Sequence, residues 1–256
     1  MGKILAVTNQ KGGVGKTTTC VNLAASLVAT RKKVLVIDLD PQGNATMGSG
    51  INKNTVEKSI YDVLVVGTPV AEVSLYSESC GYDIIPSNAD VTAAEVELLN
   101  IESKEFRLRD ALAIERAEYD FILIDCPPSL NMLTVNALAA AQGVIIPMQC
   151  EYYALEGLSA LLETINQIQQ ALNPTLEIEG LLRTMYDPRS SLTTDVSVQL
   201  IDHFGSKVYR TVIPRNIRLA EAPSHGLPAL HYDKQSKGAL AYLALAGEIL
   251  RRGDQV

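Results

Sequence analysis

The sequence predicts an α/β fold with a mostly parallel sheet and helices on both faces. Three observations predict it. Short apolar segments alternate with amphipathic helical segments along the chain. Two of the apolar segments, Val34–Asp38 and Phe121–Asp125, are apolar at nearly every position before the final Asp, which is typical of strands covered on both sides. A Gly-rich turn also joins the first strand to the first helix, and ligands of such sheets bind at the carboxyl ends of the strands.

The first half of the chain predicts three strands and two helices. Lys3–Thr8 is a short apolar run that ends in the Gly-rich turn. Lys16–Thr30 follows as a helix, because apolar residues recur on one face at helical spacing. Beyond Val34–Asp38, we expect a short strand at Tyr82–Pro86 and a helix at Phe106–Glu118.

The second half continues the alternation after the strand Phe121–Asp125. The expected strands are Gly143–Met148, Ile178–Met185 and Val208–Ile213. The expected helices are Leu133–Ala141, the long amphipathic Leu155–Leu172, and Gly238–Arg251, which has apolar residues on one face. Since no linker, repeat or low-complexity block interrupts this order, we expect one domain over residues 1–256.

Composition excludes several classes of protein. The 256 residues are 47% hydrophobic and 20% charged, which argues against intrinsic disorder. The four cysteines form no C-x-x-C pair and have no histidine near them, so we expect buried free thiols in a reducing compartment. No apolar run reaches the roughly 18 residues of a membrane span, and no signal-like N-terminus is present. These features predict a cytoplasmic protein.

The strongest motif is the segment from Lys11 to Thr18, which follows a strand and opens a helix. This context predicts a phosphate-binding P-loop, and hence a P-loop NTPase fold. Glycines let the backbone N–H groups turn toward an anion, and the helix N-terminus adds a partial positive charge. Lys16 is expected to bridge the β- and γ-phosphates, and the Thr17 hydroxyl to bind Mg²⁺. The expected nucleotide-binding residues of the loop are Lys11, Gly12, Gly13, Val14, Gly15, Lys16, Thr17 and Thr18.

Acidic residues end two of the predicted buried strands. Asp38 and Asp40 follow the second strand, and Asp125 ends a later one in the Walker B position. A single Asp after a strand is often a turn former or a helix cap. Two such strand ends beside a P-loop favour a magnesium site instead. Asp125 is expected to support Mg²⁺ or its water shell, and Asp38 to share that role.

The P-loop departs from the usual G-x-x-x-x-G-K-[ST] pattern, because Gln10 occupies the first glycine position and Lys11 follows it. A lysine there marks the deviant Walker A group. Together with other segments, the loop resembles the ParA/Soj family of chromosome- and plasmid-partitioning ATPases over nearly the whole chain. The matching segments are Asn9–Thr19, Asp38–Asn44, Ile124–Leu130, Gln149–Leu158 and Val212–His225.

The resemblance implies an ATPase that depends on ATP and Mg²⁺. In such a family Lys11 reaches the phosphates bound by a second subunit, so that ATP drives formation of a homodimer. Asp40 orients the attacking water, and the catalytic set is Lys11, Lys16 and Asp40. With no evident arginine finger near the loop, we expect slow basal hydrolysis that a ParB-type centromere-binding protein stimulates. The resemblance also points to adenine contacts from Met185, Pro214, Arg215 and Asn216.

Charge is distributed unevenly along the acidic chain. Residues 1–182 carry 12 Lys and Arg against 22 Asp and Glu, whereas residues 183–256 carry 10 against 7. The resemblance assigns nonspecific double-stranded DNA binding to this basic part, in particular to Arg189 and Arg218, with Lys234 and Lys237 nearby. Such binding needs only phosphate contacts and no sequence reader. It implies a nucleoid-associated protein in the cytoplasm.

Three other functions remain alternatives. A MinD-like membrane-cycling ATPase shares the deviant loop but ends in a basic amphipathic helix, whereas this chain stops just after a helix that we expect to be packed in the core. A metal-cluster carrier or reductase of the same fold would need paired cysteines. A transcriptional regulator would need an additional DNA-reading domain, and this chain begins two residues before its first strand. We therefore expect no membrane binding and no sequence-specific operator binding.

Overall fold

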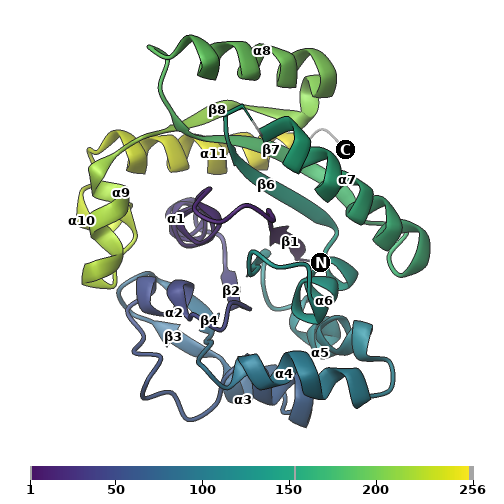
Figure 1. Ribbon diagram of the computed structural model, residues 1–256. Helices are drawn as coiled ribbons and strands as arrows, with labels where there is room; N and C mark the ends of the chain where they lie inside the picture. Colours follow the sequence, from purple (N-terminus) through teal and green to yellow (C-terminus); the bar gives the residue numbers. More distant parts are fainter. Residues whose placement is uncertain (1, 153, 254–256) are drawn as a thin grey trace.

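A computed structural model of the chain, described here for residues 2–152 and 154–253, contains one eight-stranded sheet (Figure 1). The strand order is β3-β4-β2-β5-β1-β6-β7-β8. All neighbouring strands are parallel except β3 and β4, which are antiparallel at one edge. The strands are β1 (Lys3–Val7), β2 (Val34–Asp38), β3 (Leu75–Ser77), β4 (Tyr82–Ile85), β5 (Phe121–Asp125), β6 (Gly143–Gln149), β7 (Glu177–Tyr186) and β8 (Val208–Pro214). The predicted fold class is confirmed.

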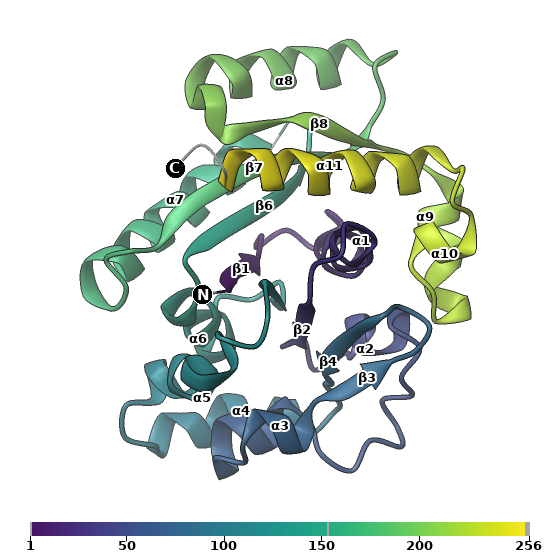
Figure 2. The ribbon, with the colours of Figure 1, turned by 180° about the vertical axis from the view of Figure 1, so that it is seen from behind.

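Helices cover both faces of the sheet, as the views from opposite sides show (Figures 1 and 2). One face carries α3 (Val70–Val73), α4 (Val91–Glu97), α5 (Arg107–Glu115), α6 (Met132–Ala140), α7 (Ala154–Ala171) and α8 (Ser191–Phe204). The other carries α1 (Lys16–Ala29), α9 (Ile217–Glu221), α10 (Ala229–Tyr232) and α11 (Lys237–Gly253), with α2 (Asn44–Gly48) packed on α1. A π-helical turn, Asp62–Val66, precedes α3.

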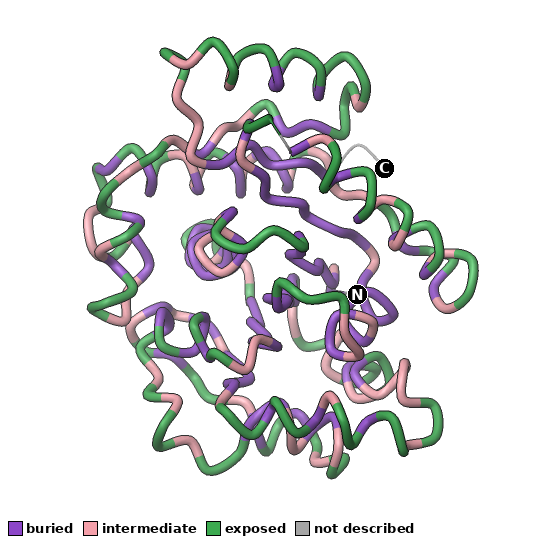
Figure 3. The backbone as a smooth tube through the Cα atoms, in the orientation of Figure 1, coloured by how far each residue is buried: buried purple, intermediate pink, exposed green. Residues whose placement is uncertain are grey.

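The strands divide the hydrophobic core into two clusters because successive side chains of a strand point to opposite faces. In β1, Ile4 faces the cluster under α3 to α8, whereas Leu5 faces the cluster under α1 and α11. Strands β2 and β5 are buried throughout, while α8 is exposed along its outer side (Figure 3). The central strands β1, β2 and β5 therefore hold the strand ends that carry the candidate site in fixed positions.

Helix α1 is buried on nearly all sides, which explains why its sequence has little amphipathic contrast. It packs on the sheet beside α11, and the Thr19 hydroxyl hydrogen-bonds the Tyr242 hydroxyl at 3.1 Å. Asn22 donates to the Thr18 carbonyl and accepts from the Ala229 amide, which ties the helix to α10. The helix that follows the P-loop is thereby fixed along its length.

The elements missed by the sequence analysis are short or polar. These are β3, the helices α2, α3, α4, α9 and α10, and the 14-residue α8. Helix α8 is rich in Ser, Thr and Val and buries only Val196, Ser197 and Leu200, so its apolar periodicity is weak. Its start was nevertheless marked, since Ser190 accepts a hydrogen bond from the Thr193 amide as an N-cap.

Candidate active site

The P-loop has the backbone conformation that its glycines predict. Gly13 and Gly15 have φ values of +74° and +90°, a region that side chains with a Cβ atom seldom adopt. Gly15 is the left-handed residue directly before α1, and no side chain caps the helix there. The first N–H groups of α1 therefore remain directed at the loop, where an anion can accept from them.

Two strands anchor the loop from the side. Thr184 Oγ1 of β7 donates to the Val14 carbonyl at 2.8 Å, and Gln149 Nε2 of β6 donates to the Gly13 carbonyl at 3.1 Å. Asn9 Nδ2 donates to the Pro147 carbonyl, while Asn9 Oδ1 accepts from the Lys11 amide. These contacts hold the loop in place relative to strand ends that lie 136 to 170 residues away in sequence.

The two lysines of the loop lie in different environments. Lys16 is buried, and its Nζ donates to the Lys11 carbonyl at 3.2 Å across the loop. Burial lowers the pKa of Lys16, while the nearby Asp125 acts in the opposite direction. Lys11, by contrast, is half exposed and forms a 2.5 Å ion pair with Glu151, a residue just beyond β6. Lys16 thus faces the interior of the loop and Lys11 its surface.

The acidic residues predicted at the strand ends are brought together. Asp38 and Asp125 are register partners on the adjacent strands β2 and β5, and both are fully buried. Asp38 Oδ2 accepts from the amide and the hydroxyl of Thr46 at 2.8 and 2.7 Å. Despite these bonds, burial raises the pKa of Asp38 to about 6. Asp38 therefore also positions the start of α2.

Asp125 is the least satisfied group at this edge. Both carboxyl oxygens are buried, and among the described residues neither has a hydrogen bond of normal geometry, although the Thr17 hydroxyl lies close enough to lower the pKa of Asp125. Burial and the neighbouring Asp38 raise the pKa of Asp125 well above its usual value, while Thr17 and Lys16 act in the opposite direction. A buried carboxylate with unused oxygens beside a threonine hydroxyl fits a hard cation that takes oxygen ligands. The residues present therefore fit Mg²⁺.

Asp40 lies at the next turn, where it is partly exposed. Its Oδ1 accepts from the Gln42 amide at 2.9 Å, and its carbonyl accepts from the Ser87 hydroxyl at 2.7 Å. The Asp40 amide in turn donates to Asp38 Oδ1. This network fixes the Asp40 backbone beside Asp38.

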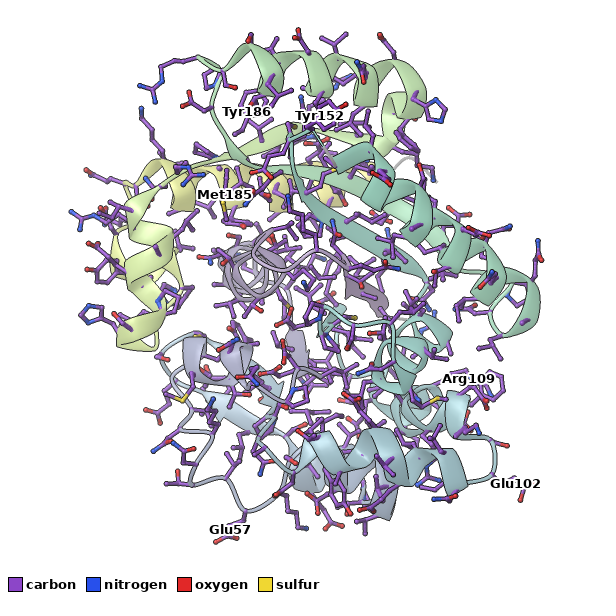
Figure 4. All side chains as sticks on the ribbon, viewed as in Figure 1. Glu57, Glu102, Arg109, Tyr152, Met185 and Tyr186 are labelled. Atoms are coloured by element: carbon purple, nitrogen blue, oxygen red, sulfur yellow. The ribbon has the colours of Figure 1, made fainter. Side chains whose placement is uncertain are left out.

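The residues predicted to contact adenine lie at the carboxyl ends of β7 and β8. Pro214 ends β8 in register with Tyr186, next to Met185, and Figure 4 shows Met185 and Tyr186 on the same side of the molecule. Met185 has a φ of +48°, and Gln149 Nε2 lies 2.7 Å from its sulfur. Asn216 Oδ1 is buried and finds no hydrogen-bond partner among residues 2–152 and 154–253. It is an acceptor suited to an exocyclic amino group; Arg215, the fourth predicted residue, is exposed.

The predicted DNA-binding residues differ in their ionic partners. Arg189 is highly exposed and forms a two-pronged pair with Asp187, which holds the pKa of Asp187 at about 2. Arg218 pairs with Glu221 and Asp233. Lys234 and Lys237 are exposed, and within the described part of the chain neither forms a salt bridge. The two lysines thus carry charge that is not neutralised by an intramolecular pair.

Sequence reasoning missed four residues that shape the site. Glu151 holds Lys11, Thr184 and Gln149 anchor the loop, and Thr46 binds Asp38. Gln149 and Glu151 lie in a segment that carries the family resemblance, and both follow a predicted buried strand. Thr184 and Thr46 gave no such signal, because their roles depend on contacts between distant segments.

The cysteines, the acidic residues and the helices bear on three further expectations. All four cysteines are free and buried, as predicted. Among the residues described, no group of three or more His, Cys, Asp or Glu could hold a metal ion by itself. None of the described helices combines the length and the hydropathy that a membrane crossing needs.

Comparison with known proteins agrees with this geometry. A family model described as an AAA domain matches residues 2–178. The chain is 68% identical to an uncharacterized protein of Pseudomonas putida over 98% of this chain and 96% of that protein. It is 53% identical to the sporulation initiation inhibitor protein Soj of Bacillus subtilis over 99% of this chain and all of Soj. It is 50% identical to the chromosome partitioning protein ParA of Myxococcus xanthus over 98% of this chain and 89% of that protein.

Among solved structures, a cobyrinic acid a,c-diamide synthase from Mycobacterium smegmatis, with a bound ATP analog and magnesium, superposes with a TM-score of 0.87. The two share 37% identity over 99% of this chain and 96% of that one. The AMPPNP-bound putative plasmid partition protein of Borrelia burgdorferi superposes with a TM-score of 0.77 at 27% identity, over 98% of each chain. The extent and level of identity to ParA and Soj decide the family. This chain belongs to the ParA/Soj family of chromosome-partitioning ATPases.

Proposed function

We propose that the chain is a single ATPase domain over residues 1–256 that moves DNA cargo by an ATP-driven cycle. ATP binding joins two copies face to face, the dimer binds DNA without sequence preference, and a ParB-type protein stimulates hydrolysis that resets the cycle. The observation that carries this proposal is the contrast between the two loop lysines. Lys16 is buried within the loop, whereas Lys11 is half exposed and pairs with the exposed Glu151.

Within one subunit, Lys16 and the amides of the loop bind the phosphates, and Thr17 and Asp125 hold Mg²⁺, with Asp38 beside them. The cation supplies charge neutralisation of the β- and γ-phosphates. The unpartnered oxygens of Asp125 support its role, since a buried carboxyl otherwise has no compensation for lost hydration. Asn216 accepts a hydrogen bond from the adenine amino group, with Met185, Pro214 and Arg215 around the base.

Lys11 acts on the second subunit. An ammonium group at the surface reaches the partner's triphosphate only when it leaves Glu151, so the dimer exchanges two intramolecular ion pairs for two intermolecular ones. Loss of the γ-phosphate removes the anion that favours this exchange. Asp40 orients the attacking water, and catalysis consists of positioning and charge stabilisation by Lys16 and Lys11.

DNA binding follows from dimerisation because two basic surfaces combine. Lys234 and Lys237 offer cations that form no salt bridge with the described residues, whereas Arg189 and Arg218 exchange carboxylates for phosphates. Nonspecific phosphate contacts of this kind place the dimer on the nucleoid, in the cytoplasm.

The deciding experiment measures ATPase activity with and without DNA and with and without the ParB-type protein of the same genome. We expect slow basal hydrolysis and strong joint stimulation. In parallel, sedimentation of the Asp40→Ala variant with saturating ATP is expected to give dimers. Single subunits under those conditions, or a high basal rate that neither addition changes, would refute the proposed cycle.

A salt titration tests the DNA surface. Arg218→Ala is expected to weaken binding of the ATP-bound dimer equally across DNA sequences and to flatten the dependence on salt. The double variant Lys234→Ala/Lys237→Ala is expected to have the larger effect, since its charges are not paired internally. If all these variants bind DNA like the wild type, the surface is assigned wrongly.

A further inference from the structure

Strand β4 ends beside the strand that carries Asp38. Strands β2 and β4 are parallel neighbours with Ile37 in register with Ile85, and α2 lies next to them (Figures 1 and 2). Ser87 follows two residues beyond Ile85 and is fully buried. Because the carboxyl ends of parallel strands meet at one edge of a sheet, Ser87 lies at the same edge as the turn that contains Asp40.

Ser87 binds the backbone of this turn directly. Its hydroxyl donates to the Asp40 carbonyl at 2.7 Å. The Gly43 amide donates to the same carbonyl at 2.8 Å, but that bond lies within the turn and moves with it. Among the described residues, the Ser87 hydroxyl is therefore the hydrogen bond that ties the Asp40 carbonyl to the end of a strand.

Gly43 shows how closely the turn packs against this strand end. Its φ is +60°, and a Cβ atom at this position would lie 2.9 Å from the Ser87 carbonyl oxygen and 2.8 Å from Lys53 Cδ. A side chain would thus collide with the backbone at Ser87, and only glycine allows both the backbone angle and the close approach. The turn consequently has a defined position against the end of β4.

A second path to Asp40 runs through Thr46, which is also fully buried. The Thr46 hydroxyl donates to Asp38 Oδ2 at 2.7 Å and accepts from the Ser87 amide at 2.9 Å. Asp38 Oδ1 in turn accepts from the Asp40 amide at 3.1 Å. Asp40 is therefore held at its amide through Asp38 and Thr46, and at its carbonyl by Ser87.

The side chain of Asp40 keeps one oxygen for a ligand. Oδ1 accepts from the Gln42 amide at 2.9 Å, whereas Oδ2 forms no hydrogen bond of normal geometry with residues 2–152 and 154–253. Asp40 is partly exposed, so water can reach this oxygen. The place of a water bound there depends on the backbone of Asp40, and a displacement of about 1 Å can lower a rate about 10²-fold.

We propose that Ser87 and Thr46 are positioning residues for hydrolysis, which fix Asp40 and thereby the water that attacks the γ-phosphate. Both hydroxyls act through Asp40 and Asp38, while the P-loop binds the phosphates. Their loss consequently lowers the rate of hydrolysis without a matching loss of ATP affinity or of the dimer. This inference rests on the proposed function, which gives Asp40 its role.

Ser87→Ala tests the direct contact in the full chain. Single-turnover assays give the rate constant of basal hydrolysis, titration calorimetry gives the ATP dissociation constant, and sedimentation gives the ATP-dependent dimer. The Asp40 carbonyl keeps the Gly43 amide as a donor, so no buried acceptor loses its last partner. We expect the rate constant to fall about tenfold or more, while ATP affinity and dimerisation stay within about twofold of the wild type.

The matched control is Ser26→Ala. Ser26 is fully buried in α1, and its hydroxyl donates to the Asn22 carbonyl at the same distance of 2.7 Å. The control therefore removes the same kind of hydrogen bond at a position that does not contact Asp40. It is expected to hydrolyse ATP like the wild type.

Two substitutions of Thr46 separate the hydroxyl from the shape of the side chain. Thr46→Val keeps the shape and removes the hydroxyl, whereas Thr46→Ser keeps the hydroxyl and removes a methyl group. We expect Thr46→Val to lower the rate constant about tenfold or more, and Thr46→Ser to restore most of the lost rate. A role in packing alone predicts the opposite order, because serine leaves a small cavity that valine fills.

The outcomes separate this inference from the proposed function. If Asp40→Ala is inactive but Ser87→Ala and Thr46→Val hydrolyse ATP at the wild-type rate, the positioning role is refuted and the role of Asp40 stands. A parallel loss of ATP affinity or dimerisation in Ser87→Ala would also overturn the inference, since the hydroxyl would then support the whole site. If Asp40→Ala itself hydrolyses ATP normally, the proposed role of Asp40 fails, and the inference fails with it.

Discussion

Replacing Glu151 by Gln removes the charge that holds Lys11 on its own subunit. The pair is short, at 2.5 Å, but both side chains are about half exposed, so solvent screens it. Exposed pairs of this kind contribute about 0.2–1 kcal/mol. A dimer must open two of them. If each pair contributes about 0.5 kcal/mol, the substitution lowers the free-energy cost of dimerisation by about 1 kcal/mol, and we expect the ATP-dependent dimer to bind about fivefold more tightly.

The measurement is the dimer dissociation constant by sedimentation equilibrium with ATP, in an Asp40→Ala background that blocks turnover. The control is a double-mutant cycle with Lys11→Ala, in which Glu151→Gln is expected to give no gain because the competing ammonium group is absent. Glu102→Gln serves as a matched exposed acid. A dimer that is unchanged or weaker in Glu151→Gln, or an equal gain without Lys11, would show that the pair does not compete with dimerisation.

Three further predictions concern separate contacts. Asp125→Asn is expected to lower Mg²⁺-dependent hydrolysis about 10²-fold or more. The unfolding temperature without nucleotide is expected to stay unchanged, because the amide replaces a buried carboxyl whose pKa is raised. A large loss of stability in calorimetry would contradict this. In titration calorimetry, Asn216→Ala is expected to reduce the preference for ATP over inosine triphosphate about fivefold, because one hydrogen bond contributes about 1 kcal/mol. An unchanged ratio of the two dissociation constants would remove Asn216 from the base site. Glu248 is buried, which raises its pKa, but hydrogen bonds from Thr211, Arg210 and Arg252 outweigh burial and lower it. The ionised Glu248 therefore stabilises the folded chain above about pH 4.5, and this stabilisation is lost as the pH falls through the lowered pKa. Glu248→Gln is expected to lower the free energy of unfolding by about 1–3 kcal/mol at pH 7 and by progressively less in more acidic solution. A pH-independent loss in denaturant titrations would refute this.

The order of the main strands and helices was readable from the sequence because it depends on local patterns. Val34–Asp38 and Phe121–Asp125 were predicted with their observed ends, since a buried parallel strand is apolar throughout and stops at a polar residue. The glycines of the P-loop likewise require backbone angles that few other residues adopt. Such features need no knowledge of what lies across the sheet.

Contacts between distant segments were not readable in the same way. The Lys11–Glu151 pair joins residues 140 positions apart, and the Thr184–Val14 bond joins residues 170 apart. Either contact is known only once the strand order brings β1 beside β6 and β6 beside β7. Helix α8 was missed for a different reason, since its Ser- and Thr-rich sequence buries few side chains.

The buried charges at the strand ends link nucleotide binding to stability. The carboxylates of Asp38 and Asp125 are buried side by side, and the charge of Asp38 raises the pKa of Asp125. Burial disfavours the charged form of Lys16 as well. Hydrophobic packing does not favour charged groups at the centre of a sheet. A bound dication would offset the carboxylates, and a triphosphate would offset Lys16. A ligand at 100 times its dissociation constant stabilises the folded chain by about 2.7 kcal/mol. Lys11 lies outside this buried set, paired with Glu151. In the proposed cycle we therefore expect ATP to complete the charge balance of one subunit before Lys11 of the second subunit exchanges Glu151 for the bound phosphates.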